Sequence, residues 1–323
     1  MNFYKVIQSG TWRSDMKEDK ESCMLCPRAC KVQRGEEKRG YCGETWQVRA
    51  ARASLHLWEE PCISGQKGSG TIFFSGCSLR CVFCQNKSIA RGDKGRKVTI
   101  EQLAELFLIL QDNKASTINL VTPTHFVPQI VLALERAKKN GLILPVVYNT
   151  ASYEMVETIQ RLEGLVDIYL PDMKYKSKEI SDKYSKAPDY FEYASKAIKE
   201  MVRQVGEPVF EKGLMKHGVI VRHMVMPGYT KDSKEILKYL YETYGNKIYL
   251  SILNQYTPPK DLQEFPEIQR RVTKREYKKV VDYAIELGIE RAFVQEGKTA
   301  QESFIPDFDE PIFLENVTKS TIL

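Results

Sequence analysis

Short apolar runs alternate with longer helical patterns from about residue 70 onward, and this alternation limits the possible folds more than any other feature of the chain. Strands are expected at 71–75, 116–122, 143–149, 165–170, 218–225, 247–253 and 291–295. Helices are expected between them at 99–112, 126–140, 153–162, 190–205, 231–244 and 274–287. Such alternation is typical of βα units around a parallel sheet. We therefore predict an α/β fold, a partial (βα)6 TIM-like barrel, with an open doubly wound sheet as the alternative.

The chain has 323 residues, of which 42% are hydrophobic, enough for one large core. No apolar run reaches the roughly 18 residues that a membrane span needs, and the first 20 residues do not resemble a secretory signal. We expect a soluble, cytoplasmic protein. In that reducing compartment the eight cysteines are expected to be metal ligands or catalytic groups rather than disulfides.

The charge pattern argues against a nucleic-acid partner. The net charge of +6 arises from 48 basic and 42 acidic residues, which are interspersed as on solvated helix faces. A basic stripe interleaved with exposed aromatic side chains would indicate nucleic-acid binding, and the sequence does not favour one.

Three segments follow from this pattern. Residues 1–69 are rich in cysteine and do not follow the βα rhythm, so we expect a small N-terminal module that holds a metal or cluster site. Residues 70–300 form the expected core barrel. Residues 301–323 contain two prolines and no periodicity, which predicts an irregular C-terminal tail.

The stretch GCSLRCVFCQN places Cys77, Cys81 and Cys84 in a C-x3-C-x2-C spacing directly behind the apolar run TIFF. A structural zinc site normally needs four protein ligands, so three thiols leave a vacancy, which Cys62 or His56 would have to fill. A 4Fe-4S cluster held by three thiolates tolerates the vacancy, because the fourth iron then binds a small chelating ligand. A loop after the first barrel strand is also where functional groups gather in such folds.

The C-x3-C-x2-C motif resembles that of the radical S-adenosylmethionine (radical SAM) superfamily, including Phe83 before the third cysteine and Asn86 two residues after it. The segments EEPCISGQKGSGTIFFSGCSLRCVFCQN, INLVTPTHF, YLPDMKY, RHMVMPGYT and SILNQYTPP more narrowly resemble the branch related to the pyruvate formate-lyase activating enzyme. The resemblance covers about residues 20 to 310. It implies a 4Fe-4S cluster on the three cysteines, with S-adenosylmethionine (SAM) chelating the open iron. Reductive cleavage of SAM would give a 5′-deoxyadenosyl radical that abstracts a hydrogen atom.

The same resemblance assigns further SAM-binding residues. The glycine-rich GGE turn of the family is replaced here by NLVTPTH, in which Thr122 is the candidate contact to SAM. The alternative is that Pro123 simply ends the strand. Asn149 and Thr150 stand where the activating enzymes have an Asp-Thr pair. Asp172 and Lys174 match the family's Asp-Leu-Lys motif, and a surface ion pair is the alternative. The Asp172–Lys174 spacing on an extended segment puts both side chains on one face, which suits a cation that meets a ligand carboxylate.

Strands five and six supply the last candidates. Arg222 shares a face with Met224 and, if it points inward, would bind a carboxylate; a solvated edge residue is the alternative. Asn254 and Tyr256 share a face and are candidates for the methionine carboxylate or the substrate. Two histidines are candidates for substrate handling or for structural hydrogen bonds, namely His56 and His125.

A second cysteine set lies upstream, with C-x2-C-x3-C spacing and a fourth cysteine behind a Gly-Tyr turn. It consists of Cys23, Cys26, Cys30 and Cys42. Four thiolates without a vacancy fit a structural zinc site or a second iron-sulfur cluster that passes electrons inward. Cys62 is expected to be a plain buried or loop thiol.

The function hypothesis is an oxidoreductase of the radical SAM type that needs a flavodoxin or ferredoxin type electron donor and anaerobic conditions. Its substrate is either a glycyl radical enzyme, which would make it an activase, or a peptide or small metabolite modified directly. The alternative from another class is a non-catalytic iron-sulfur or zinc protein that carries electrons or binds RNA.

Overall fold

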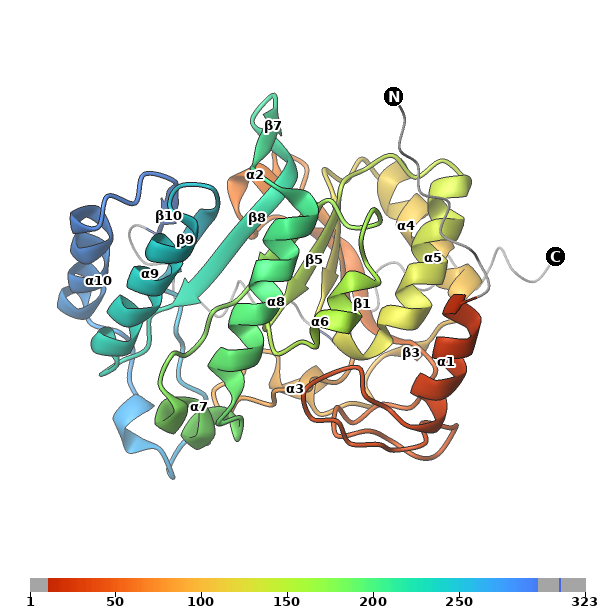
Figure 1. Ribbon diagram of the computed structural model, residues 1–323, viewed down its shortest axis with the longest axis horizontal. Coiled ribbons are helices and arrows are strands. Elements are labelled where there is room, and N and C mark those ends of the chain that lie inside the picture. The colour runs from red at the N-terminus through yellow and green to blue at the C-terminus, as the bar shows by residue number, and fades with distance from the viewer. Residues whose placement is uncertain (1–10, 296–307, 309–323) are drawn as a thin grey trace.

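The computed structural model describes residues 11–295 and 308, and its centre is a single ten-stranded sheet (Figure 1). The strand order is β10-β9-β8-β6-β5-β4-β2-β1-β3, with β7 paired to β8. Parallel neighbours run from β2 to β10; their bounds are Ser69–Phe74 (β2), Ile118–Val121 (β4), Val146–Thr150 (β5), Ile168–Pro171 (β6), Leu214–Met224 (β8), Tyr249–Leu253 (β9) and Ala292–Val294 (β10). All seven predicted strands are present, which confirms the α/β fold.

The sheet is a partial barrel. His56 on β1 and Val294 on β10 lie near opposite ends of the strand order, yet both line one cavity. The sheet therefore curls around that cavity instead of lying open, as the barrel prediction required.

Five long helices and the short α6 pack along the outside of the sheet (Figure 1). Their bounds are Ile100–Asp112 (α4), Val127–Lys139 (α5), Val156–Gln160 (α6), Tyr190–Val205 (α8), Thr230–Tyr244 (α9) and Lys274–Glu286 (α10). Thr99 and Thr273 each form a capping box with the residue three positions on, Gln102 and Glu276, which fixes where α4 and α10 begin. Helix α6 is shorter than predicted, because residues 161–165 continue as turns.

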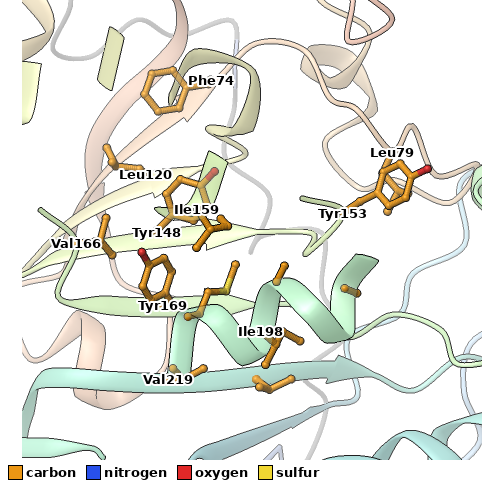
Figure 2. Close-up of a cluster of buried hydrophobic side chains, with 14 of the residues drawn as sticks. Phe74, Leu79, Leu120, Tyr148, Tyr153, Ile159, Val166, Tyr169, Ile198 and Val219 are labelled. Atoms are coloured by element: carbon orange, nitrogen blue, oxygen red, sulfur yellow. The ribbon is translucent and has the colours of Figure 1, made fainter. Parts of the chain in front are cut away.

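The core lies between the sheet and these helices. Figure 2 shows Tyr148, Tyr169 and Val219 on neighbouring strands gathered with Ile198 of α8 in one cluster. Strands β2, β4, β5 and β6 are buried along their whole length, as expected for parallel strands that are covered on both faces.

The two ends of the barrel carry different short elements (Figure 1). Helix α2 (Pro61–Ser64) packs against β8 near the starts of the strands. Helices α3 (Lys87–Ala90) and α7 (Lys178–Ser185) lie at the opposite end, where the strands finish. The loop that follows β2 therefore opens at the carboxyl end of the sheet.

Strand β1 (Arg49–His56) falls inside the range expected as a separate N-terminal module, yet it pairs antiparallel with β2 in the register Ala53↔Ile72. The short strands β3 (Arg96–Lys97) and β7 (Val209–Glu211) were also not predicted. The sequence of β1, RAARASLH, has too little apolar alternation to stand out as a strand. The sheet thus starts before residue 70, while the domain limits themselves stay a prediction.

The described residues before β1 begin with α1 (Thr11–Glu21) and continue as irregular chain packed on the helix side of the barrel. Thr158 Oγ1 donates to the carbonyl of Leu25 at 3.0 Å, and Gln129 Nε2 donates to that of Trp46 at 2.5 Å. Of the predicted tail 301–323, only Phe308 is among the described residues, and its ring meets that of Phe73 at 5.4 Å. The rest of the tail lies outside them.

Candidate functional site

One cavity of about 470 Å³ lies inside the curled sheet, a size in the range of small-molecule sites. It runs from the loop after β2 at the strand ends toward the residues that precede α2. Its polar and sulfur-bearing lining residues are His56, Glu59, Glu60, Cys77, Cys81, Cys84, Gln85, Asn86, Thr122, Asn149, Thr150, Asp172, Lys174, Arg222, Ser251, Gln255 and Gln295.

The predicted cysteine triad comes together at this cavity. Cys77, Cys81 and Cys84 all line it, and each side chain is partly exposed. The loop curls because Gly76 and Arg80 take positive φ angles of 86° and 54°. An arginine in the left-handed backbone conformation is strained, and such strain is common in the loops of functional sites. Such a curl is what three thiols in eight residues need in order to face one centre.

Burial and the charges within the triad raise the pKa of two of its members, Cys81 and Cys84. Burial, then the charges of Cys77 and Cys81, raises the pKa of Cys84 to about 12. Burial also raises the pKa of Cys81, while Lys174 opposes that shift. Ser185 Oγ donates to Cys81 Sγ at 3.1 Å. The thiols are thus close enough to repel one another as thiolates, and a positively charged metal centre would relieve that repulsion.

Behind the triad lies a network of charged and amide groups. Lys174 Nζ donates to Asp172 Oδ2 at 2.6 Å, and Arg222 Nε donates to Asp172 Oδ1 at 2.8 Å. Arg222 Nη2 donates to Asn149 Oδ1 at 2.5 Å. Burial raises the pKa of Asp172, but Arg222 and Lys174 outweigh it and the net shift is downward. Four of the predicted residues therefore form one hydrogen-bonded network at the cavity wall, in which Asp172, Lys174 and Arg222 are charged.

Lys174 is the cation best placed for a ligand. Burial lowers its pKa, but Asp172 and then Cys81 outweigh burial, so the net shift is upward and the ammonium is retained. Three of the five N–H groups of Arg222 are already used by protein side chains. Lys174 has only Asp172 as an ion-pair partner among the described residues.

The remaining predicted lining residues are also at the cavity. Thr122 has a φ of 57°, and its backbone N–H donates to the carbonyl of Asn149 at 2.9 Å. The Thr150 hydroxyl donates to Glu154, so it is not free for a ligand. Phe83 lines the cavity and packs against Tyr256 at 5.8 Å between ring centroids. Asn86 lies at the start of α3.

Two predicted residues do not reach the cavity wall. The backbone N–H of Asn254 donates to Gln295 Oε1 at 2.6 Å, and the Tyr256 hydroxyl donates to the carbonyl of Ile268 at 2.8 Å. Gln255, between them, lines the cavity instead, and its carbonyl accepts from Gln85 Nε2 at 2.9 Å. Ser251, Leu253 and Gln255 all line the cavity, so the alternation of β9 continues past the end of the strand. Asn254 and Tyr256 therefore lie on the other face.

The histidines divide by location. His56 lines the cavity, and burial followed by the charge of Arg52 lowers its pKa to about 4. His125 is buried behind the cysteine loop, where Nε2 lies 2.7 Å from the carbonyl of Ser75. His223 is likewise buried with Nδ1 at 2.8 Å from the carbonyl of Met173. Of these three histidines, His56 is the one placed to touch a ligand in the cavity.

Sequence reasoning missed two adjacent acids, Glu59 and Glu60. Glu59 Oε1 accepts from Asn119 Nδ2 at 2.9 Å and from Asn149 Nδ2 at 3.4 Å, while Oε2 pairs with Arg222 Nη1 at 3.2 Å. Burial raises the pKa of both glutamates, and Arg222 opposes each shift. The only signal was two acids before a proline, next to a glycine-rich turn.

The four N-terminal cysteines are brought together. A Cβ on Gly40 would lie 3.4 Å from Cys42 Sγ and 3.5 Å from Cys30 Sγ. The charges of Cys42 and Cys23 both contribute to the raised pKa of Cys26, after burial. Burial raises the pKa of Cys42 to about 11, which the nearby Arg34 opposes. In the described part of the chain, no three His, Cys, Asp or Glu side chains are grouped as ligands of a single metal ion.

Two contacts connect this cysteine set to the cavity. The backbone N–H of Cys77 donates to the carbonyl of Cys42 at 3.1 Å. Arg28 Nε donates to the carbonyl of Ser78 at 2.9 Å, and Nη2 donates to that of Ser185 at 2.8 Å. Cys62, by contrast, lies in a separate apolar cluster, as a plain buried thiol would.

The comparisons with known proteins agree with this site. The model of the radical SAM superfamily matches residues 71–240, more than half of the chain. The chain belongs to the radical SAM superfamily. It is an enzyme of that superfamily, whose chemistry uses a 4Fe-4S cluster and SAM. An uncharacterised protein of Methanocaldococcus jannaschii is 30% identical over 280 residues, which are 82% of this chain and 74% of that protein.

Two solved structures are similar to part of the chain at low identity. SuiB of Streptococcus suis bound to S-adenosylmethionine is 14% identical with a TM-score of 0.48, over 72% of this chain and 52% of SuiB. A domain of the pyruvate-formate lyase-activating enzyme of Bacteroides vulgatus is 12% identical with a TM-score of 0.38, over 53% of this chain and 91% of that domain. The chain thus spans about half the length of SuiB.

No helix within the described ranges is both long enough and apolar enough to cross a membrane.

Proposed function

We propose that this chain is a radical SAM enzyme whose cluster is bound by Cys77, Cys81 and Cys84, and that SAM and substrate share the 470 Å³ cavity beside them. The observation that carries the proposal is that three thiols from one curled loop face the same cavity as a partly buried Asp-Lys-Arg network. Three thiolates fit a site-differentiated 4Fe-4S cluster, which keeps one iron for a small ligand.

The residue roles follow from the geometry. Lys174 presents an ammonium next to Cys81, so it suits the SAM carboxylate at the cluster. Asp172 fixes Lys174 and Arg222 from its two oxygens and acts as a positioning residue. Asn149 offers polar atoms from β5, and Thr122 offers backbone groups at its left-handed turn.

When bound, the cluster and SAM supply a 5′-deoxyadenosyl radical by one-electron cleavage of the sulfur–C5′ bond. The protein's part is to hold the reactants and to exclude water and side reactions. Phe83 is only 4% exposed and Leu79 is fully buried, and both line the cavity beside the cysteines. Their apolar surfaces shield the place where the radical would form.

For the N-terminal cysteines Cys23, Cys26, Cys30 and Cys42 we propose a metal centre, either a structural zinc ion or a second iron-sulfur cluster. The two thiols beside Gly40, Cys30 and Cys42, and the effect of the Cys42 and Cys23 charges on Cys26 support a closed site. The hydrogen bond between Cys42 and Cys77 supports a role close to the first cluster. Iron, sulfide and zinc analysis of protein purified without oxygen distinguishes the two.

For the substrate we propose a segment of another protein, with a glycyl radical enzyme as the first candidate and a free peptide or metabolite as the second. Trp58 and Val294 support a protein partner, because they line the cavity yet are 59% and 41% exposed. Exposed apolar groups at a cavity mouth are typical of interaction sites. A flavodoxin or ferredoxin type protein would supply the electron.

The test is anaerobic reconstitution followed by dithionite and SAM. We expect 5′-deoxyadenosine and methionine from the wild-type protein and none from Cys81→Ala. Cys30→Ala is the matched control, since it removes a thiol upstream and should leave the barrel cluster assembled. A reduced cluster that forms no 5′-deoxyadenosine would refute the enzymatic assignment, and equal iron loss in both variants would refute two separate sites.

A further inference from the structure

Glu60 has an unusual position for a carboxylate. It is only 7% exposed, lines the cavity, and its Oε2 has no hydrogen-bond partner in the described part of the chain. A buried charged atom without a partner costs free energy. Glu60 also directly precedes α2, so it lies at the end of the cavity away from the cysteine loop.

A second unpartnered acceptor belongs to a residue that contacts the neighbouring Glu59. Asn119 is fully buried on β4, and its Nδ2 donates to Glu59 Oε1 at 2.9 Å. That bond fixes the amide orientation, because a flipped amide would turn its oxygen toward the carboxylate. Asn119 Oδ1 is left without a partner. The two orphan atoms on either side of Glu59 are both acceptors.

The charges of the cavity wall do not balance. Among the described lining residues there are three carboxylates, Glu59, Glu60 and Asp172, and two cations, Lys174 and Arg222. Arg222 forms ion pairs with Glu59 and Asp172, and Lys174 pairs with Asp172. Glu60 is left with the longer-range charge of Arg222 and a hydrogen bond from Ser251.

We propose that Glu60, supported by Glu59, binds a positively charged ammonium or guanidinium group of the substrate. This inference rests on the proposed function, because it assigns the substrate to the same cavity. A cationic group with several N–H donors would satisfy the orphan acceptor and balance the wall charge at once. The lining residues Val121 and Met224 offer an apolar surface for the alkyl part of such a group.

A neutral donor or a water molecule is the competing occupant. Burial favours a protonated Glu60, and a protonated carboxyl would then donate to a neutral carbonyl or amide. The two cases differ in what binds: an ionised Glu60 prefers a cation over its neutral counterpart, whereas a protonated Glu60 does not.

The experiment is calorimetric titration of the anaerobically reconstituted protein in the presence of SAM. The cationic probes are n-pentylamine, n-butylguanidine and the capped tripeptides Gly-Lys-Gly and Gly-Arg-Gly. The neutral counterparts are n-pentanol and capped Gly-Gln-Gly. The small cations and the capped peptides are titrated separately, so the result also shows whether the cavity accepts the charged group of a small molecule or of a peptide.

We expect at least one cationic probe to bind the wild-type protein roughly tenfold or more tightly than its neutral counterpart. Glu60→Gln, which keeps the shape and removes the charge, should abolish that preference while SAM still binds. Glu101→Gln is the control, because Glu101 is an exposed acid on α4 paired with Arg136, and it should change nothing.

Three results would overturn the inference: equal binding of neutral and cationic probes, an unchanged preference in Glu60→Gln, or no binding of any cationic probe. The comparison of cationic and neutral probes on the wild-type protein tests the inference even if Glu60→Gln does not fold. Failure of the proposed function is distinguishable, because SAM would then neither bind nor be cleaved in the same preparation.

Discussion

Arg28 is the side chain whose loss should most weaken the connection between the N-terminal cysteines and the cluster loop. Its guanidinium donates to backbone carbonyls of Ser78, Leu79, Ser185 and Lys186. Two of these residues belong to the C-x3-C-x2-C loop, and Ser185 itself donates to Cys81 Sγ. The plane of Arg28 also lies over the ring of Tyr41, 4.4 Å from its centroid.

The magnitude follows from the two best-defined bonds, to Ser78 at 2.9 Å and to Ser185 at 2.8 Å. A hydrogen bond from a charged donor is worth about 1.5–3 kcal/mol. Arg28 is half-buried, so water recovers part of this when the side chain is removed. We therefore expect Arg28→Ala to lower the free energy of unfolding by about 3 kcal/mol, and Arg28→Lys to recover less than half of it, because an ammonium lacks the planar fork.

The assay is urea unfolding of the metal-free protein together with the iron content after reconstitution. Arg136→Ala is the matched control, since its exposed pair with Glu101 should contribute less than about 1 kcal/mol. We expect Arg28→Ala to lose iron from the barrel cluster as well as stability. Normal iron loading and a stability loss no larger than that of Arg136→Ala would refute the idea that Arg28 holds the loop.

Two further predictions concern stability. Burial raises the pKa of Glu154 from its ordinary 4.5 to about 7, so its contribution is present below pH 4.5 and is lost as the pH rises toward 7. The loss is at most about 1.4 kcal/mol per pH unit. Urea unfolding between pH 4.5 and 7 should show this slope, and Glu154→Gln should flatten it; an unchanged slope in the variant contradicts the assignment. Gly43→Ala should destabilise the protein by several kcal/mol, because φ of Gly43 is +90° and the new Cβ would lie 2.2 Å from the carbonyl oxygen of Arg91. Gly141 has a similar φ of +100° but lies in open space. Gly141→Ala should therefore cost only the roughly 1–2 kcal/mol of a left-handed alanine. Thermal unfolding measures both, and equal losses would show that the close approach of the two chain segments costs nothing.

The parallel strands and the long helices could be predicted because their patterns are local. Strand β6, for example, is a continuous apolar run, and α4 and α10 begin at threonine caps that are visible in the sequence. Strand β1 could not be predicted, because its alanines and arginines acquire their pattern only through pairing with β2.

In the candidate site, too, some residues could be placed from the sequence and others could not. Cys77, Cys81, Cys84, Asp172 and Lys174 follow strands directly, so their place in the chain fixes their place at the strand ends. The residues after β9 keep the alternation of the strand, but the sequence does not say which face points inward, so Asn254 and Tyr256 were assigned to the wrong face. The two acids before α2 reach the cavity only through the path of the loop, for which the sequence gives no periodic signal.

The contact between Arg28 and Ser185 joins residues 157 positions apart. At the usual translation rate of 5–20 residues per second, a ribosome needs roughly 8–31 s to make that length of chain. The four upstream thiols therefore emerge long before the barrel segments that cover them exist. The metal centre proposed for these thiols would therefore have to be loaded during synthesis, or its thiols kept reduced and apart until residue 185 appears.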